Sequence, residues 1–263
     1  MKRDRLIPVE KSKKVIYLDP RGRGVDQKHY GARALYVLAV LCALYCVGIG
    51  LFVGFGSFFF LIWGVIAIFC AAWGWILTHK SVQERIPRWI RMTFRALVAA
   101  GMLLLLILEG IAIAEKIQPF GSGSFLIVDA LHQYLPFFAD YQEKLKHMDS
   151  MFYSFHAGLG YNFLGLWAYY LASPLNLVIA LVPKSMLTMV LSHLYVLKIA
   201  LCCFTAAFYF RKRRGKDEIS IVAFGMAYGL CSYMVGYSWN IMWMEVMMML
   251  PLILYGVDKL IKE

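Results

Sequence analysis

The segment that organises this chain is residues 125–176, FLIVDALHQYLPFFADYQEKLKHMDSMFYSFHAGLGYNFLGLWAYYLASPLN. It carries three of the six histidines and four acidic side chains, and the segments on both sides of it are long and apolar. Functional residues of proteins are found disproportionately on such connecting segments. We therefore expect the chemistry of this chain to be carried by residues 125–176 and by the elements that pack against them.

The composition of the whole chain is that of an integral membrane protein. Of the 263 residues, 61% are hydrophobic, and mean hydropathy is +0.64, whereas a soluble domain has about 45–50% apolar residues. The net charge of +11 comes mainly from lysines and arginines at residues 2–33, 80–95 and 211–216, which flank apolar segments. Such flanks mark the cytoplasmic side of a membrane, so they predict contact with the lipid bilayer and no nucleic-acid partner.

The six cysteines all lie inside apolar segments, and no two of them have CxxC spacing. This placement is typical of small packing residues. It favours neither disulfides nor a zinc site.

The pattern predicts an all-α integral membrane fold with about six transmembrane helices, each close to the length of about 20 residues that crosses the hydrocarbon. The expected spans are residues 34–53, 58–77, 96–114, 186–210, 219–236 and 241–257. With the basic blocks inside, both termini are cytoplasmic, and residues 115–185 form a large first extracytoplasmic loop with interfacial or re-entrant helices. The expected location is the plasma membrane, with multiple passes.

The apolar residues 161–183 are the one ambiguous segment. If they crossed the membrane, the next span would place the four basic residues 211–214 outside, against the positive-inside rule. Pro174 also interrupts the apolar run, because proline breaks a helix. We therefore expect an interfacial or re-entrant segment on the outer side, although a true span stays open.

Asp129, His132 and Gln133 form the first candidate site. Their spacing of i, i+3 and i+4 places them on one face of a helix, and an apolar stripe formed by Val128, Leu131, Leu135 and Phe138 predicts that this helix lies at the membrane interface. Pro136 is expected to kink or restart it. A carboxylate beside a histidine there fits a general base, or Asp129 simply caps the helix or faces water.

Two further clusters are expected on the same outer face. His156 precedes the glycines of Gly158-Leu-Gly160, which permit close backbone approach to a ligand or a plain tight connection. Trp239, Asn240, Trp243 and Glu245 stand at the outer edge of the last span, where an ionisable group is a functional candidate by default. The alternative there is an aromatic anchor with a snorkelling glutamate.

Three motifs of this chain resemble the YfhO family of bacterial membrane proteins. They are VDALHQYLPFF (residues 128–138), FYSFHAGLGYNFLGLWAYYLASPLNL (152–177) and YSWNIMWME (237–245) followed by PLILYG (251–256). The resemblance runs from about residue 96 to the end. It implies a glycosyltransferase of the GT-C type, which takes a sugar from a polyprenyl-phosphate carrier at the outer face. The implied acceptor is a cell-envelope polymer such as lipoteichoic acid.

The resemblance also implies roles for individual residues. Asp129 matches the essential acidic residue of the first extracytoplasmic loop, as general base or as ligand of a divalent cation. The residues implied at or near the substrate pocket are His132, Gln133, Tyr134, His156, Asn162, Asn240 and Glu245. The family pattern has Asp where this chain has Glu245, so the chain departs from the family pattern at that residue.

The expected division of the chain follows from this resemblance. Residues 1–33 are a basic cytoplasmic tail, residues 34–78 an additional N-terminal transmembrane hairpin, and residues 94–263 a partial GT-C-like membrane module. The family is much longer than this chain, so a truncated enzyme, or one completed by a C-terminal chain, is expected. A non-catalytic subunit that binds the lipid carrier or a partner is the alternative. A transporter fits less well, since the polar residues gather on one face and no inverted repeat is present.

Overall fold

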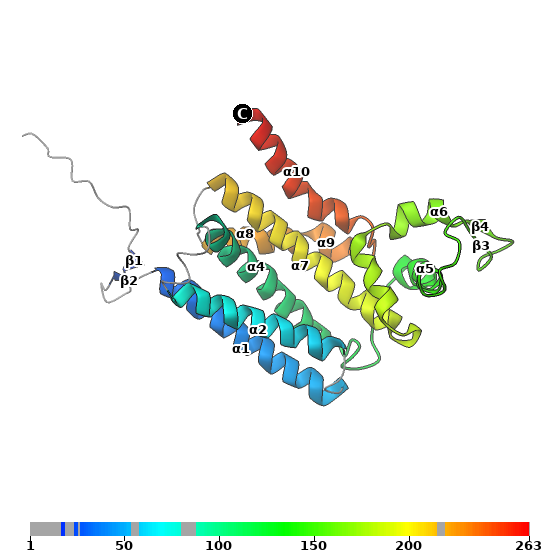
Figure 1. Ribbon diagram of the computed structural model, residues 1–263, viewed down its shortest axis with the longest axis horizontal. Helices are drawn as coiled ribbons and strands as arrows, with labels where there is room; N and C mark the ends of the chain where they lie inside the picture. Colours follow the sequence, from blue (N-terminus) through cyan, green and yellow to red (C-terminus); the bar gives the residue numbers. More distant parts are fainter. Residues whose placement is uncertain are drawn as a thin grey trace, which may run out of the picture.

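The computed structural model is almost entirely helical (Figure 1), and it describes residues 17–18, 24–25, 27–53, 58–79, 88–214 and 219–262. Three predicted features lie wholly or partly outside the described residues: most of the tail, the turn at residues 54–57, and residues 80–87 of the basic segment 80–95. The elements of the bundle are α1 (Gln27–Val53), α2 (Phe58–Thr78), α4 (Arg88–Ala114), α7 (Leu187–Arg214), α8 (Ile219–Gly229), α9 (Ser232–Tyr237) and α10 (Met244–Lys262).

Each predicted span coincides with a helix or a helix pair. α1 begins at Gln27, earlier than the expected residue 34, and the tail also contains a short ladder between β1 (Tyr17–Leu18) and β2 (Gly24–Val25). By length and composition, Lys184–Arg214 and Ser220–Tyr237 are long and apolar enough to cross a membrane, and a bent pair adds a third candidate among the described residues. The structure therefore supports an all-α membrane protein, and the count of six spans stays a prediction.

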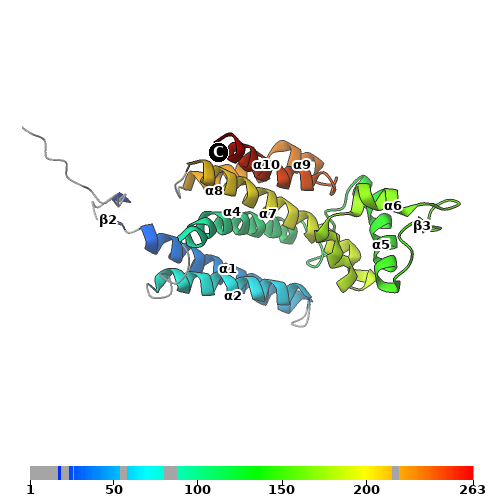
Figure 2. The same cartoon turned by 45° about the horizontal axis from the view of Figure 1, so that its top comes forward.

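α7 is the central helix of the bundle, since it contacts α4, α8 and α10. Its 28 residues extend about 42 Å at 1.5 Å per residue, which exceeds a hydrocarbon core of about 30 Å. α1 and α2 pack together as a hairpin along one side of the bundle (Figure 2). Apolar side chains of four helices form the core there, including Cys42, Trp63, Leu105 and Val196.

Residues 115–186, here called the loop module, gather at one end of α7 (Figures 1 and 2). Their elements are η1 (Ala130–Tyr134), α5 (Leu135–His147), β3 (Tyr153–Ser154), β4 (Tyr161–Asn162), α6 (Phe163–Leu166), η2 (Trp167–Leu171), η3 (Pro174–Leu181) and η4 (Lys184–Met186). The largest buried cluster joins this module to α7, α9 and α10 through side chains such as Phe138, Phe163, Leu191 and Met234. The loop module is thus packed on the bundle through a continuous apolar core.

The predicted break at Ser173-Pro174 is confirmed. Phe163–Leu171 and Pro174–Leu181 meet at an angle of 107°, so residues 161–183 do not form one straight helix. The Gln142 side chain of α5 donates to the carbonyls of Ile179 (2.6 Å) and Val182 (3.0 Å), which ties η3 to α5. The Ile179 carbonyl also accepts from the Val182 N–H at 3.4 Å, whereas Val182 follows the last residue of η3, so its carbonyl has no partner inside that helix.

The helix expected around Asp129 has a different geometry. Residues 130–134 form a π-helical turn, so the α-helical spacing that predicts a shared face for Asp129, His132 and Gln133 does not apply there. Pro136 stands in the first turn of α5, so it restarts the helix as expected. The apolar stripe is divided: Phe138 is buried, whereas Val128 and Leu131 lie on the protein surface.

Candidate functional site

Asp129 stands directly after a strained backbone position. Val128 has φ = +49°, a left-handed conformation that is an outlier for a β-branched residue. The Val128 carbonyl accepts hydrogen bonds from the backbone N–H groups of Leu131 and His132, both at 3.2 Å. Such positions cost about 1–3 kcal/mol and persist only where the surroundings enforce them, often at functional sites. The backbone that presents Asp129 is therefore held in place by its neighbours.

The carboxylate of Asp129 is half-exposed and available. Asp129 occupies the N-cap position of η1, yet its side chain makes no capping hydrogen bond. The interpretation of Asp129 as a helix cap is therefore wrong. Its charge does act on a neighbouring phenol: burial, together with the negative charge of Asp129, raises the pKa of Tyr134 to about 12. Both effects disfavour a second negative charge at this place.

Tyr134 connects the loop module to the turn before α10. Its hydroxyl donates to Asn240 Oδ1 at 2.8 Å, and both side chains are buried. The amide nitrogen of Asn240 is buried without a hydrogen-bond partner among the described residues. Nearly all buried polar groups in proteins have a partner, so an orphaned donor points to a water or ligand. Next to Tyr134, Gln133 makes a longer contact from Nε2 to the Tyr170 hydroxyl, at 3.4 Å.

Lys198 is a functional candidate that the sequence analysis missed. It lies in the middle of α7 with 1% of its side chain exposed, and its Nζ is 2.6 Å from Glu245 Oε1. The ammonium also donates to Asn176 Oδ1 (3.3 Å) and to the Ile241 carbonyl (3.4 Å). Lys198 is the only Lys, Arg, Asp or Glu between residues 187 and 210. A lone charge in an apolar span is a functional candidate by default, and this signal was present in the sequence.

Glu245 is paired with Lys198 but not saturated. Oε1 of Glu245 is paired with the Lys198 ammonium, whereas Oε2 is buried without a hydrogen-bond partner among the described residues. A carboxylate has about four lone-pair sites, so Glu245 can accept further hydrogen bonds. We call Tyr134, Asn176, Lys198, Asn240 and Glu245 the junction cluster.

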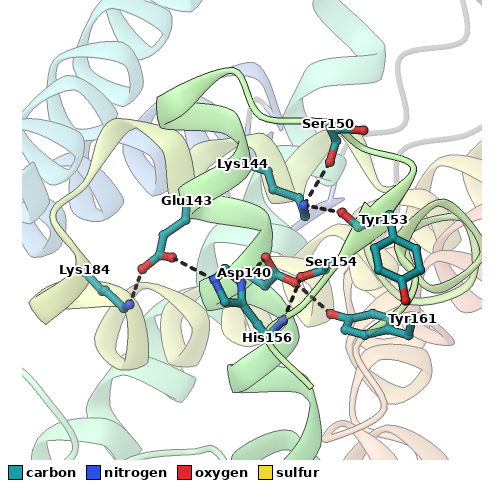
Figure 3. Close-up of polar contacts among 9 residues, drawn as sticks. All are labelled: Asp140, Glu143, Lys144, Ser150, Tyr153, Ser154, His156, Tyr161 and Lys184. Carbon is teal, nitrogen blue, oxygen red and sulfur yellow. Dashed lines mark hydrogen bonds and ion pairs between the residues drawn. The ribbon is translucent and has the colours of Figure 1, made fainter. Parts of the chain in front are cut away.

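A second polar group, the loop cluster, comprises Asp140, Glu143, His156, Tyr161 and Lys184 (Figure 3). The buried Asp140 carboxylate lies 2.8 Å from His156 Nδ1 and accepts from the Tyr161 hydroxyl at 2.7 Å. Burial alone would raise the pKa of Asp140, but hydrogen bonds from Ser154, Tyr161 and His156 outweigh it and lower the pKa. The same burial and the Asp140 contact raise the pKa of Tyr161 to about 12. Asp140 is thus a saturated, ionised carboxylate.

The solvent side of the loop cluster contains a surface ion pair. His156 Nε2 is 4.0 Å from Glu143 Oε2, and Glu143 also pairs with Lys184. The Lys184 contact lowers the pKa of Glu143. His156 itself is 61% exposed at its side chain. One ring nitrogen of His156 is therefore oriented by Asp140, and the other faces solvent and Glu143.

Other predicted site residues have local structural roles. Asn162 caps α6, since its Oδ1 accepts from the Gly165 N–H at 3.1 Å. Gly158 and Gly160 have positive φ, and a Cβ on Gly160 would stand 2.2 Å from the Tyr153 hydroxyl oxygen. The two glycines thus fit the tight connection between β3 and β4. His132 is exposed, and it belongs to neither cluster.

The structure brings together some of the predicted residues and separates others. Tyr134 meets Asn240, and Asp129 acts on Tyr134. Glu245 meets Lys198, whose ammonium also contacts the Ile241 carbonyl next to Asn240, whereas His156 belongs to the loop cluster. Within the part of the chain that the structure describes, no group of three His, Cys, Asp or Glu side chains has the geometry of a metal site.

Comparison with known proteins identifies the family. Neither the curated proteins nor the solved structures include a match to this chain. The model of the family described as bacterial membrane protein YfhO matches residues 99–263, which is more than half of the chain and includes η1, the loop module and the junction cluster. The first hairpin, α1 and α2, precedes the matched region. The chain therefore belongs to the YfhO family of bacterial membrane proteins.

Proposed function

We propose that this chain is a membrane glycosyltransferase of the GT-C type, or the N-terminal part of one. It moves a sugar from a polyprenyl-phosphate carrier to a cell-envelope polymer such as lipoteichoic acid at the outer face of the membrane. Membership of the YfhO family supports a membrane protein with such a role. The observation that carries the proposal is the Asp129 carboxylate, which makes no capping hydrogen bond and has no ion pair within the described part of the chain, beside a cluster with unused hydrogen-bonding capacity.

The proposed role of Asp129 is that of a general base. The acceptor hydroxyl oxygen forms a bond to the anomeric carbon, the bond from that carbon to the phosphate oxygen breaks, and the lipid phosphate leaves with the electron pair. Asp129 takes the proton that the hydroxyl loses. A carboxylate without a competing donor suits this role, because its lone pairs remain available to the incoming hydroxyl.

The junction cluster has the groups that a sugar requires. Sugar hydroxyls both donate and accept, so one can accept from the Asn240 amide nitrogen and one can donate to Glu245 Oε2, which are both buried without a hydrogen-bond partner among the described residues. Gln133 and the exposed His132 and His156 are proposed to contact the acceptor or the sugar. Lysines of the loop module are proposed to meet the lipid phosphate. Positioning by such contacts supplies much of the rate of group transfer between two bound reactants.

The test is sugar transfer by purified protein in lipid nanodiscs. The donors are synthetic polyprenyl-phosphate glucose, galactose and N-acetylglucosamine, and the acceptor is lipoteichoic acid. We expect Asp129→Asn to lower the rate at least about 100-fold, since general-base catalysis contributes roughly 10²–10⁴. Elution on size exclusion and apparent Tm should stay as in the wild type. Asp149→Asn, an exposed carboxylate of the same module, is the matched control and should transfer normally.

Two outcomes would contradict the proposal. Normal transfer by Asp129→Asn would remove Asp129 from the mechanism. Binding of polyprenyl phosphate without transfer by the wild type, with any of these donors, would favour a subunit that only binds the lipid carrier.

A further inference from the structure

The loop that leads to Asp129 is attached to α7 at two neighbouring positions. Residues 117–128 form most of the connection between the end of α4 at Ala114 and Asp129. His193 Nε2 lies 2.9 Å from the Gln118 carbonyl oxygen. One residue earlier on α7, Ser192 Oγ lies 3.0 Å from Ser124 Oγ and accepts from the Phe125 N–H at 3.3 Å. The path of this loop, and with it the position of Asp129, depends on these contacts.

His193 is in turn held by a buried carboxylate from α4. Its Nδ1 lies 2.8 Å from Glu109 Oε1, and the side chains of His193 and Glu109 are 9% and 3% exposed. The hydroxyl of Tyr45, on α1, donates to the other carboxylate oxygen, Glu109 Oε2, at 2.6 Å. Side chains from α1 and α7 thus contact the Glu109 carboxylate of α4, in the half of the bundle next to the loop module.

The hydrogen-bond partners determine how many protons this group holds. The Gln118 carbonyl only accepts, so His193 carries a proton on Nε2. A single proton then lies between Nδ1 and Glu109 Oε1, whether the pair is written as imidazolium and carboxylate or as neutral imidazole and carboxylic acid. The pair is neutral overall in both forms. This neutrality explains how two ionisable groups remain in an apolar bundle, where an unpaired charge is very costly.

We propose that Glu109 and His193 are positioning residues: through the Gln118 carbonyl they hold residues 117–128 on α7, and thereby place Asp129 for sugar transfer. The role in transfer rests on the proposed function, whereas the attachment of the loop does not. Glu109 fixes the orientation of the His193 ring, and the ring fixes the loop. A displacement of about 1 Å at the reacting group can cost roughly 100-fold in rate.

Tyr45 connects the Glu109–His193 pair to the first hairpin, α1 and α2. Its ring packs on Trp63 of α2 at 4.5 Å between centroids and on Phe120, within the 117–128 loop, at 5.9 Å. Tyr45 therefore contacts both the Glu109 carboxylate and the loop. Since the hairpin precedes the region matched by the family, Tyr45 connects a segment outside that region to the proposed site.

The test combines an activity-independent measurement with kinetics. Backbone hydrogen exchange of residues 117–128 is followed by mass spectrometry in nanodiscs, together with kcat and KM for the polyprenyl-phosphate sugar that the wild type uses. In His193→Leu we expect exchange of residues 117–128 to rise at least about tenfold, with exchange in α8 and α10 unchanged. We expect kcat to fall at least about tenfold and KM to change less than about twofold, because the donor contacts remain.

Conservative variants separate positioning from charge. In Glu109→Gln the new amide can donate to Nδ1 and accept from Tyr45, so exchange and kcat should stay near the wild type. Glu109→Leu should behave as His193→Leu. Tyr45→Phe should raise exchange of residues 117–128 about two- to threefold. Its matched control is Tyr209→Phe, which loses a hydroxyl contact to Asp258 near the opposite end of α7 and should leave the loop unchanged.

Each outcome decides the proposal. Unchanged exchange of residues 117–128 in both His193→Leu and Tyr45→Phe would overturn it, whatever happens to kcat. If His193→Leu fails to fold, Tyr45→Phe against Tyr209→Phe gives the answer. If the wild type transfers no sugar, the proposed function fails, while the exchange measurement still decides whether Glu109 and His193 hold the loop.

Discussion

The loop cluster and the junction cluster use the same chemical groups in opposite ways. In the loop cluster, the Asp140 carboxylate receives contacts from His156 and Tyr161, and Glu143 pairs with Lys184 next to solvent. In the junction cluster, Lys198 has three partners, but the Asn240 amide nitrogen and Glu245 Oε2 are buried without hydrogen bonds among the described residues. One cluster is saturated, and the other has capacity left.

This difference distinguishes a structural role from a ligand-binding role. A saturated carboxylate such as Asp140 gains most by staying where it is, so it fixes the β3–β4 hairpin on α5. An unsaturated buried group lowers stability until a ligand supplies its missing partner. The junction cluster, with Asp129 beside Tyr134, therefore has more capacity for hydrogen bonds to a ligand than the loop cluster has. Four predictions test this contrast, from the largest effect to the smallest.

The largest effect is expected when the junction pair is broken on one side. Lys198→Met leaves Glu245 without its counter-ion in an apolar surrounding, which costs about 3–5 kcal/mol. We expect a clear drop in apparent Tm in detergent. The double variant Lys198→Met with Glu245→Leu should recover most of this loss, because replacement of a whole buried pair is often neutral. A double variant as unstable as the single one would contradict this account of the pair.

The next effect distinguishes the two aspartates of the loop module. Asp140→Ala removes the acceptor of Tyr161 and His156 and should lower stability by about 2–3 kcal/mol. Asp129→Ala removes a carboxylate without a capping bond and should change stability by less than about 0.5 kcal/mol. Thermal unfolding and limited proteolysis of the β3–β4 hairpin measure both. Equal losses in the two variants would remove the distinction.

The pH dependence of stability follows from the lowered pKa of Asp140. Because its pKa in the folded protein is below the ordinary value of 3.8, its contribution is present above that value. The contribution is lost as the pH falls from 3.8 through the folded pKa. The difference in apparent Tm between wild type and Asp140→Asn should therefore be present at pH 5 and shrink below about pH 4. A difference that grows as the pH falls below about 4 would have the wrong sign.

The smallest effect is expected at the surface pair. Lys184 and Glu143 are 64% and 35% exposed at their side chains, and exposed ion pairs contribute about 0–1 kcal/mol. Lys184→Gln should therefore lower the free energy of unfolding by less than about 1 kcal/mol. The stability of this variant should then change little with salt concentration. Thermal unfolding at low and high ionic strength measures this, and a loss comparable with that of Asp140→Ala would show that the pair is part of the saturated core.

The elements of the fold were largely predictable, and the partners within the sites were not. Apolar length and Pro174 sufficed for the helices and for the break before η3, because both signals are local. The sequence alone shows that Glu109 and Lys198 are single charged residues within apolar spans, but it does not indicate their partners. The local pattern at Asp129 misled, since nothing in the spacing distinguishes the π-helical turn of η1 from an α-helix.

What the sequence determined by itself is a helical membrane chain of the YfhO family, with its polar residues concentrated in one loop. The tertiary structure alone decided which of those residues meet. Asp140 of α5 pairs with His156 of the β3–β4 connection, and Lys198 meets Glu245 and the Ile241 carbonyl across 47 and 43 positions of sequence. Apolar periodicity indicates which face of a helix is buried. Polar side chains of two helices form a contact only where the packing of the helices brings their atoms within about 3 Å. Partners for Asn176, Lys198 and Glu245 therefore follow from the crossing of α7 with η3 and α10.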